Sequence, residues 1–331
     1  MTLTKLVARC ALVTASVAAL CLSSRSPALA SAQIGRFTIN FNEGVFHRNG
    51  DFVIPGRVTG NSPDGDFVSD RAVGNYQRQD VTLIGHVVLH QHLAAQRGPA
   101  PDAMTLTSDQ LRINGQTRTY AATGAVTAVQ GSRTLQAGSM QLDDRTHEAV
   151  LQKNVHVREN DRQIDSEEIH YNTVSGALIM PVPVSGRGSD GDFRADRAEG
   201  NQLGGRFTLI GNVVLHRASG VGRGTLKNDP LTLWCDRLDV DNRTRISTAT
   251  GHVRIAQANR TLSGPYLRLD DNTHIGTMTG GVHGEQIPDR TFDAAELIYN
   301  TETEDFKALG GVQATFPYRR PSPSPSATPR K

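Results

Sequence analysis

Three histidines in one short segment have the residue type and spacing that most resemble a chemical site. His86, His90 and His92 stand at i, i+4 and i+6, and His90-Gln-His92 has a His-x-His spacing that some metal centres use. Neutral imidazole nitrogens bind zinc and related metals. Such a centre would also need a carboxylate shortly afterwards, and residues 93–99 contain none. We therefore expect no metal or other cofactor, and interpret these histidines as solvated strand residues.

Four acidic clusters could act as paired carboxylates or as calcium loops. They are Asp64-Gly-Asp66, Asp143-Asp144, Asp190-Gly-Asp192 and Asp270-Asp271. Their spacing lacks the further ligands that a calcium loop requires, and aspartate is a common turn former. The sequence also contains no Gly-x-Ser-x-Gly, Walker or dinucleotide-binding motif. We predict a protein without catalytic residues.

Both ends of the chain differ from its body. Lys5 and Arg9 precede an apolar run over 10–22, and Ala28-Leu29-Ala30 has the small-x-small pattern of a cleavage site. This predicts a signal peptide over 1–30 and a periplasmic location. A retained anchor is the alternative, although a membrane span needs about 20 apolar residues. Proline and serine alternate over residues 321–326, which predicts a disordered tail over 317–331.

Charge and cysteine usage narrow the class of the body. The chain has 35 Lys+Arg against 33 Asp+Glu, but three of the basic residues lie in the leader and four follow Tyr318. The remaining body is mildly acidic, unlike a nucleic-acid binder. Without the leader, Cys235 is the single cysteine, so no disulfide forms within one chain. Stability must come from an apolar core.

An internal repeat predicts the architecture. Asp64–Asn75 recurs as Asp190–Asn201 at an offset of 126, and the offset grows to 127 and 128 further along. A tandem duplication explains two one-residue insertions over so long an alignment. Within each copy we expect a strand, a polar turn, and a second strand that opens with a Thr-Gly-x-Val or Lys-Asn-Val step. The histidine cluster is not kept, because the second copy has Asn212, His216 and Ala218 there.

Apolar residues alternate with polar ones at period two, which is typical of antiparallel strands with one dry face. Asp165–Tyr171 and Asp293–Tyr299 keep this period, so we predict strands there too. Residues expected outward are Thr82, His86, Thr208, Asn212 and His216. Residues expected to line the interior are Phe37, Ile39, Phe41, Leu83, Val87, Leu89, Phe207, Leu209, Val213, Leu215, Val253, Ile255, Leu267 and Leu269.

Two recurring patterns resemble the OstA-like (LptA-like) domain family, which includes LptA, LptC and the N-terminal part of LptD. Ser108-Asp-Gln-Leu111 with Thr123-Gly-Ala-Val126 carries the likeness, and Cys235-Asp-Arg-Leu238 with Thr250-Gly-His-Val253 repeats it. The Glu-x-x-Tyr-Asn elements that end at Asn172 and Asn300 also resemble the family's last strands. The resemblance covers roughly residues 34 to 315, in two copies.

This resemblance implies an all-β fold of two tandem open β-jelly rolls, with antiparallel strands and almost no helix. The copies are expected over 31–180 and 181–316, joined at the Pro181-Val-Pro183 step. The edge strands are expected to be the first, over 35–41, and the last, from 296 onward to 316. It also implies lipopolysaccharide, or a similar acylated lipid, held by its acyl chains inside the roll, and transport partners that dock by edge-strand pairing. From the residues alone the same side chains could fill a closed core, which favours a structural envelope scaffold as the alternative. A polysaccharide-binding jelly roll is the third reading, and a single tryptophan, Trp234, counts against it.

Overall fold

In a computed structural model, the protein is described over residues 30–34, 37–62, 65–91, 104–143, 145–172, 174–201, 204–220, 229–288 and 290–317. The predicted signal peptide, apart from Ala30, and the predicted tail, apart from Pro317, lie outside these residues. Over the described residues the regular elements are strands, which confirms the all-β prediction. No helix there has the length and apolar character needed to cross a membrane.

The described residues form twenty-five strands in one antiparallel sheet. The first thirteen are β1 Ala30–Ile34, β2 Phe37–Phe41, β3 Val45–Phe46, β4 Asp51–Ile54, β5 Val58–Ser62, β6 Gly65–Ser69, β7 Arg71–Asn75, β8 Asp80–Gln91, β9 Met104–Asn114, β10 Thr119–Gln130, β11 Arg133–Asp143, β12 Glu148–Glu159 and β13 Arg162–Asn172. The others are β14 Ala177–Met180, β15 Val184–Gly188, β16 Gly191–Ala195, β17 Arg197–Asn201, β18 Arg206–Arg217, β19 Leu231–Asp241, β20 Ile246–Gln257, β21 Arg260–Asp270, β22 Ile275–Gln286, β23 Arg290–Asn300, β24 Phe306–Leu309 and β25 Gln313–Thr315.

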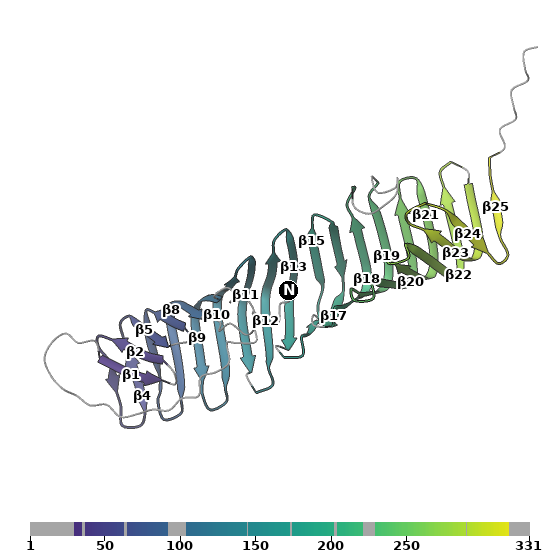
Figure 1. Ribbon diagram of the computed structural model, residues 1–331. Helices are drawn as coiled ribbons and strands as arrows, with labels where there is room; N and C mark the ends of the chain where they lie inside the picture. The colour runs from purple at the N-terminus through teal and green to yellow at the C-terminus, as the bar shows by residue number, and fades with distance from the viewer. Residues whose placement is uncertain are drawn as a thin grey trace, which may run out of the picture.

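The strands follow one another as a meander along the long axis of the molecule (Figure 1). From β8 to β13 and from β18 to β23, each long strand pairs with the next. Elsewhere the position of one long strand in the sheet is occupied by two short strands in line, with a short connecting segment between them. Thus β14 and β15 both pair with β13, and continue the sheet to β17 and β16.

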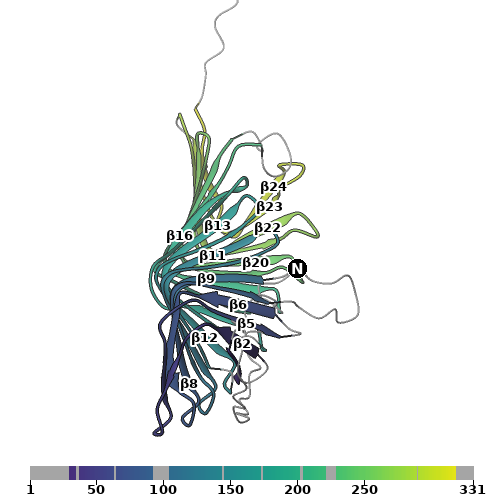
Figure 2. The same ribbon diagram turned by 90° about the vertical axis from the view of Figure 1, so that its left-hand side faces the viewer.

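A bend divides every long strand into two arms, as the end-on view shows (Figure 2). In β10 the pairing with β11 is interrupted between Thr123 and Val126, where Gly124 and Ala125 both have positive φ. Such a bulge turns the strand sharply and lets it enclose a core. Paired positive-φ residues recur in each alternate long strand, at 85/86, 153/154, 211/212, 251/252 and 280/281. We call this line of bends the corner.

The Thr-Gly-x-Val step therefore lies in mid-strand and does not open a strand, so the predicted position was wrong. The true turns are the hairpins at the free ends of the arms. At one such end, the Asx rim, Asp143 accepts hydrogen bonds from the backbone N–H groups of Arg145 and Thr146 at 2.8 and 3.3 Å. Asp241 and Asp270 make equivalent turns. Turn chemistry thus accounts for Asp143 and Asp270, whereas Asp64 and Asp144 lie outside the described residues.

Strand bounds follow the sequence repeat. Strands β4 to β13, the first repeat, correspond in order to β14 to β23, the second repeat, at offsets of 126 to 128. The sheet does not stop between them, since β13 pairs with β14 and β15. Pro181-Val-Pro183, expected to join two copies, instead lies at the corner between β14 and β15, as Pro55-Gly-Arg57 does between β4 and β5.

The ends of the sheet also differ from expectation. The predicted first strand over 35–41 is β2, which pairs with β5 on one side and with the preceding β1 on the other. It is therefore not an edge, and β1 begins at Ala30, the last residue of the predicted leader. The predicted last strand is three separate strands, because Asn300 starts an Asx turn with Glu302 and Thr303.

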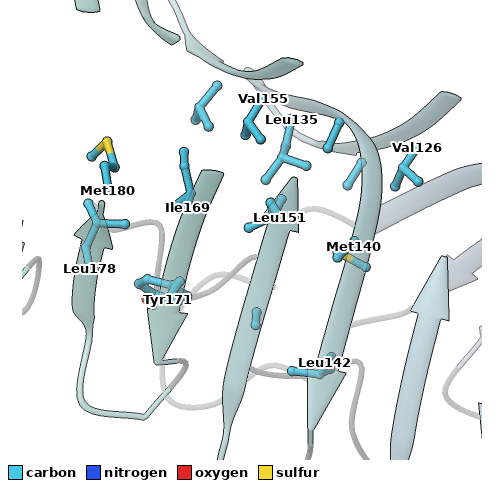
Figure 3. Packing of buried hydrophobic residues seen from close by; sticks show 14 of the residues in the cluster. Val126, Leu135, Met140, Leu142, Leu151, Val155, Ile169, Tyr171, Leu178 and Met180 are labelled. Carbon is cyan, nitrogen blue, oxygen red and sulfur yellow. The ribbon is translucent and has the colours of Figure 1, made fainter. Parts of the chain in front are cut away.

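The core lies between the two arms. In a close-up of the first repeat, Val126, Leu135 and Val155 approach Leu151, Ile169 and Tyr171 from the other side (Figure 3). All six are buried. Burial of apolar side chains, which contributes about 0.8 kcal/mol per methylene, is the main force that holds the arms together. The apolar cluster continues without a break from Ile39 to Leu297.

Candidate functional site

The inner face, which carries the buried side chains of both arms, is the candidate site. Seven of the fourteen predicted lining residues are buried on it: Ile39, Phe41, Leu83, Val87, Leu209, Val213 and Val253. Leu89 is partly buried and packs against the same core. Phe207, Leu215, Ile255 and Leu267 are also partly buried against the core, and Leu269 is half-buried. The side chain of Phe37 lies outside the described residues. Contact of this set with a lipid stays a prediction.

The two repeats differ in how fully the inner face is covered. Leu135 and Leu142 in the first repeat are 2% and 3% exposed, whereas their counterparts Leu262 and Leu269 are half-buried. Ala128 is likewise buried, while its counterpart Ile255 is only partly buried. Apolar residues at equivalent positions thus fill a closed core in the first repeat and stay accessible in the second.

Loss of side-chain volume explains the difference. Tyr120 in the first repeat corresponds to Ser247, and Val157 corresponds to Gly284. Smaller side chains leave their neighbours with fewer contacts, and an interior that is not refilled stays accessible. At Gly284 the ring of Phe292 takes the place of the lost side chain, since a Cβ there would lie 2.0 Å from it. The loss at Ser247 therefore accounts for the difference.

The residues predicted to point outward lie on the opposite face. Thr82 lies between two buried residues and Thr208 precedes the buried Leu209, and His86, Asn212 and His216 are exposed. At the corner His86 Nδ1 lies 2.7 Å from Asp70, and Asn212 donates to Asp196 at 2.9 Å. A third pair joins His252 to Asp236 at 2.8 Å.

These pairs give the corner its charge pattern. The hydrogen bond that His86 donates to the carboxylate of Asp70 raises the pKa of His86. His90 lies 2.9 Å from Asp66, and His92 is outside the described residues. Within the described part of the chain no three His, Cys, Asp or Glu side chains are grouped as metal ligands.

Cys235 lies on the inner face at the corner, where the recurring pattern places a small side chain. It is 4% exposed, and burial raises the pKa of its thiol to about 11. A thiol with so high a pKa is a poor nucleophile. Ser108, its counterpart, is also buried and donates to the carbonyl of Gln110 at 3.0 Å. The small-Asp-x-hydrophobic pattern is therefore the signature of the bend.

The single tryptophan lies on the outer face. Trp234 alternates with the buried Leu233 and Cys235, and the guanidinium of Arg254 stands 5.2 Å from its ring centroid. An arginine that covers the ring leaves less of it for stacking a sugar.

Residues 58–161 match the family model "LptC: Lipopolysaccharide-assembly, LptC-related". The match extends from β5 to the hairpin after β12, within the first repeat. A solved structure of LptH, the LptA homologous periplasmic component of the conserved lipopolysaccharide transport device from Pseudomonas aeruginosa, is similar with 9% identity and a TM-score of 0.33. That similarity covers 38% of this chain and 94% of LptH. No curated protein matches the chain.

Proposed function

We propose that this protein is a periplasmic component of a lipopolysaccharide transport bridge, and that it binds acyl chains on its inner face without catalysis. The LptC-related match over 58–161 is the observation that carries the proposal. The inner face supplies the means, since flexible acyl chains bind an aliphatic surface at about 0.8 kcal/mol per buried methylene. We also propose that 31–180 and 181–316 are two copies of one domain type.

The half-buried residues of the second repeat favour it as the acyl-binding part. Phe207 and Leu215 on β18, Ile255 on β20 and Leu267 on β21 pack against the same core from one face of the sheet. The closed core of the first repeat favours the second candidate function, an envelope scaffold without lipid cargo, for that part of the chain.

Partners are proposed to add strands at the ends of the sheet. At the C-terminal end Phe306 is 64% exposed, although its counterpart Leu178, covered by the next row, is 6% exposed. A neighbouring jelly roll could supply that next row by β-augmentation. A photoreactive residue at position 306 should crosslink to other jelly-roll components in the intact envelope. Crosslinks of equal yield from position 179 on the outer face would contradict this.

Acyl content tests the function. The full chain, purified from its envelope without detergent exchange, should release lipid on organic extraction, as measured by mass spectrometry. Leu215→Asp places a charge on the inner face and should abolish the acyl signal. Val214→Asp, one residue away on the outer face, is the matched control and should retain it. A lipid-free wild type that is fully folded would favour the scaffold.

A further inference from the structure

We infer that the second repeat carries a binding site for the anionic head group of an acylated ligand, formed by Arg217, Arg260 and Arg290 on the inner face. The inference rests on the proposed function and deepens it by naming the head-group chemistry, a phosphate or a carboxylate. The three arginines lie at the rim opposite the Asx rim, at the end of β18 and at the starts of β21 and β23.

Strand register places these side chains in one line across the sheet. The line joins, strand by strand, Arg217, Leu231, Gln257, Arg260, Gln286 and Arg290. Five of the six lie an even number of residues from a buried inner-face residue of their own strand and arm. Arg260 lies two residues before Leu262, which is partly buried against the same core, so all six belong to the inner face. With strands about 4.8 Å apart, neighbouring arginines are separated by roughly 14 and 10 Å at the backbone.

Arg217 provides the strongest single sign of a missing anion. Its Nε is buried and has no hydrogen-bond partner among the described residues. Burial also lowers the pKa of the guanidinium, and no carboxylate opposes that effect. A buried guanidinium N–H without a partner is costly, and an anionic ligand would offset that cost.

In the first repeat the arginines of the corresponding line are paired with carboxylates. Its counterparts are Gln91, Met104, Gln130, Arg133, Glu159 and Arg162. Arg133 is buried and binds Glu159 at 2.7 Å, and Arg162 binds Asp190 at 3.1 Å. In the second repeat Gln286 replaces the glutamate, and within the described residues neither Arg260 nor Arg290 has an ion pair.

The second repeat has therefore lost its carboxylate and gained an arginine at the place where its inner face is also accessible. Arg217 stands where the first repeat has Gln91. Apolar side chains below a cationic rim suit a ligand with acyl chains and a negative head group. Arginine binds such oxyanions in a bidentate way.

The test compares two ligands that share a fourteen-carbon chain, myristoyl lysophosphatidic acid and the uncharged monomyristoyl glycerol, in displacement of N-phenylnaphthylamine from the full chain. We expect the anionic lipid to bind at least about tenfold more tightly to the wild type. The triple variant R217Q/R260Q/R290Q should lose this preference while its affinity for monomyristoyl glycerol stays unchanged. Gln286→Glu, which recreates the first repeat's ion pair at Arg260, should reduce the preference severalfold.

Arg162→Gln is the matched control, since Arg162 holds the position of Arg290 in the first repeat and already has a carboxylate partner; it should keep the full preference. An unchanged preference in the triple variant would overturn the head-group site and leave acyl binding intact. If neither lipid binds the wild type, the proposed function fails as well. Displacement of the anionic lipid by 1 mM inorganic phosphate at constant ionic strength would assign the arginines to a free anion and overturn the lipid head group.

Discussion

Single residues at the corner decide whether a long strand can bend. Gly124 has φ +76°, and a Cβ there would lie 2.0 Å from a carboxylate oxygen of Asp109 and 2.7 Å from its Cβ. Gly85, Gly211 and Gly251 face an aspartate of the preceding row in the same way. The recurring aspartate and glycine therefore contact each other. Glycine is required there because its φ is positive and because the aspartate side chain approaches too closely for a Cβ.

We expect Gly124→Ala to destabilise the fold more than Gly311→Ala. Both residues have positive φ, which costs alanine roughly 1–2 kcal/mol, but a Cβ at Gly311 meets nothing within 4 Å. The clash at Gly124 should add at least about 1 kcal/mol. Thermal unfolding followed by circular dichroism measures both. Equal losses of Tm would show that the contact with Asp109 is not restrictive.

Titration of His283 gives a prediction at the same scale. Hydrogen bonds to Asp293, at 2.7 Å, and to Glu285 raise its pKa above the ordinary 6.5. The stabilisation it contributes is therefore complete below about pH 6.5 and is lost as the pH rises through the folded-state pKa. Asp293→Asn removes the larger cause and should lower the NMR titration midpoint. An unchanged midpoint would contradict the assignment.

At the scale of the strand, sequence reasoning recovered the faces and missed the bend. Alternation at Phe207, Leu209 and Leu215 correctly separated inner from outer residues, because period two survives a bulge that adds a residue with left-handed backbone. Because the alternation continues across the bulge, the sequence does not reveal it, and Thr-Gly-x-Val was interpreted as the start of a strand. The unequal covering of the two repeats was also missed, since it depends on volumes such as Tyr120 against Ser247 rather than on the pattern of polarity.

Matched leucines on β11 and β21 test that unequal covering. Leu135→Ala should cost about 2–4 kcal/mol, as for a fully buried leucine, since Leu135 is 2% exposed. Leu262→Ala, at the same place in the second repeat, should cost about half as much or less because Leu262 is half-buried. Urea unfolding monitored by hydrogen exchange on β11 and β21 gives both values. Equal costs would mean that the second repeat is as closed as the first.

At the scale of the whole molecule, one sheet and one apolar cluster run through both repeats. The pairing of β13 with β14 and β15 carries the sheet across the boundary of the repeats. The apolar cluster has no break between Ile39 and Leu297, although its side chains are more accessible in the second repeat than in the first. This continuity is what a transport bridge requires, and a stiff scaffold would use it equally well.

Site-specific photocrosslinking to lipid separates those two uses most directly. A photoreactive residue is placed at Leu215 or Leu267 on the inner face, or at the adjacent Val214 or Arg268 on the outer face, in the full chain within its envelope. We predict acyl-chain adducts, identified by mass spectrometry, at 215 and 267 and none at 214 and 268. Equal labelling of both faces, or no labelling of a folded protein at any of the four positions, would contradict acyl binding on the inner face.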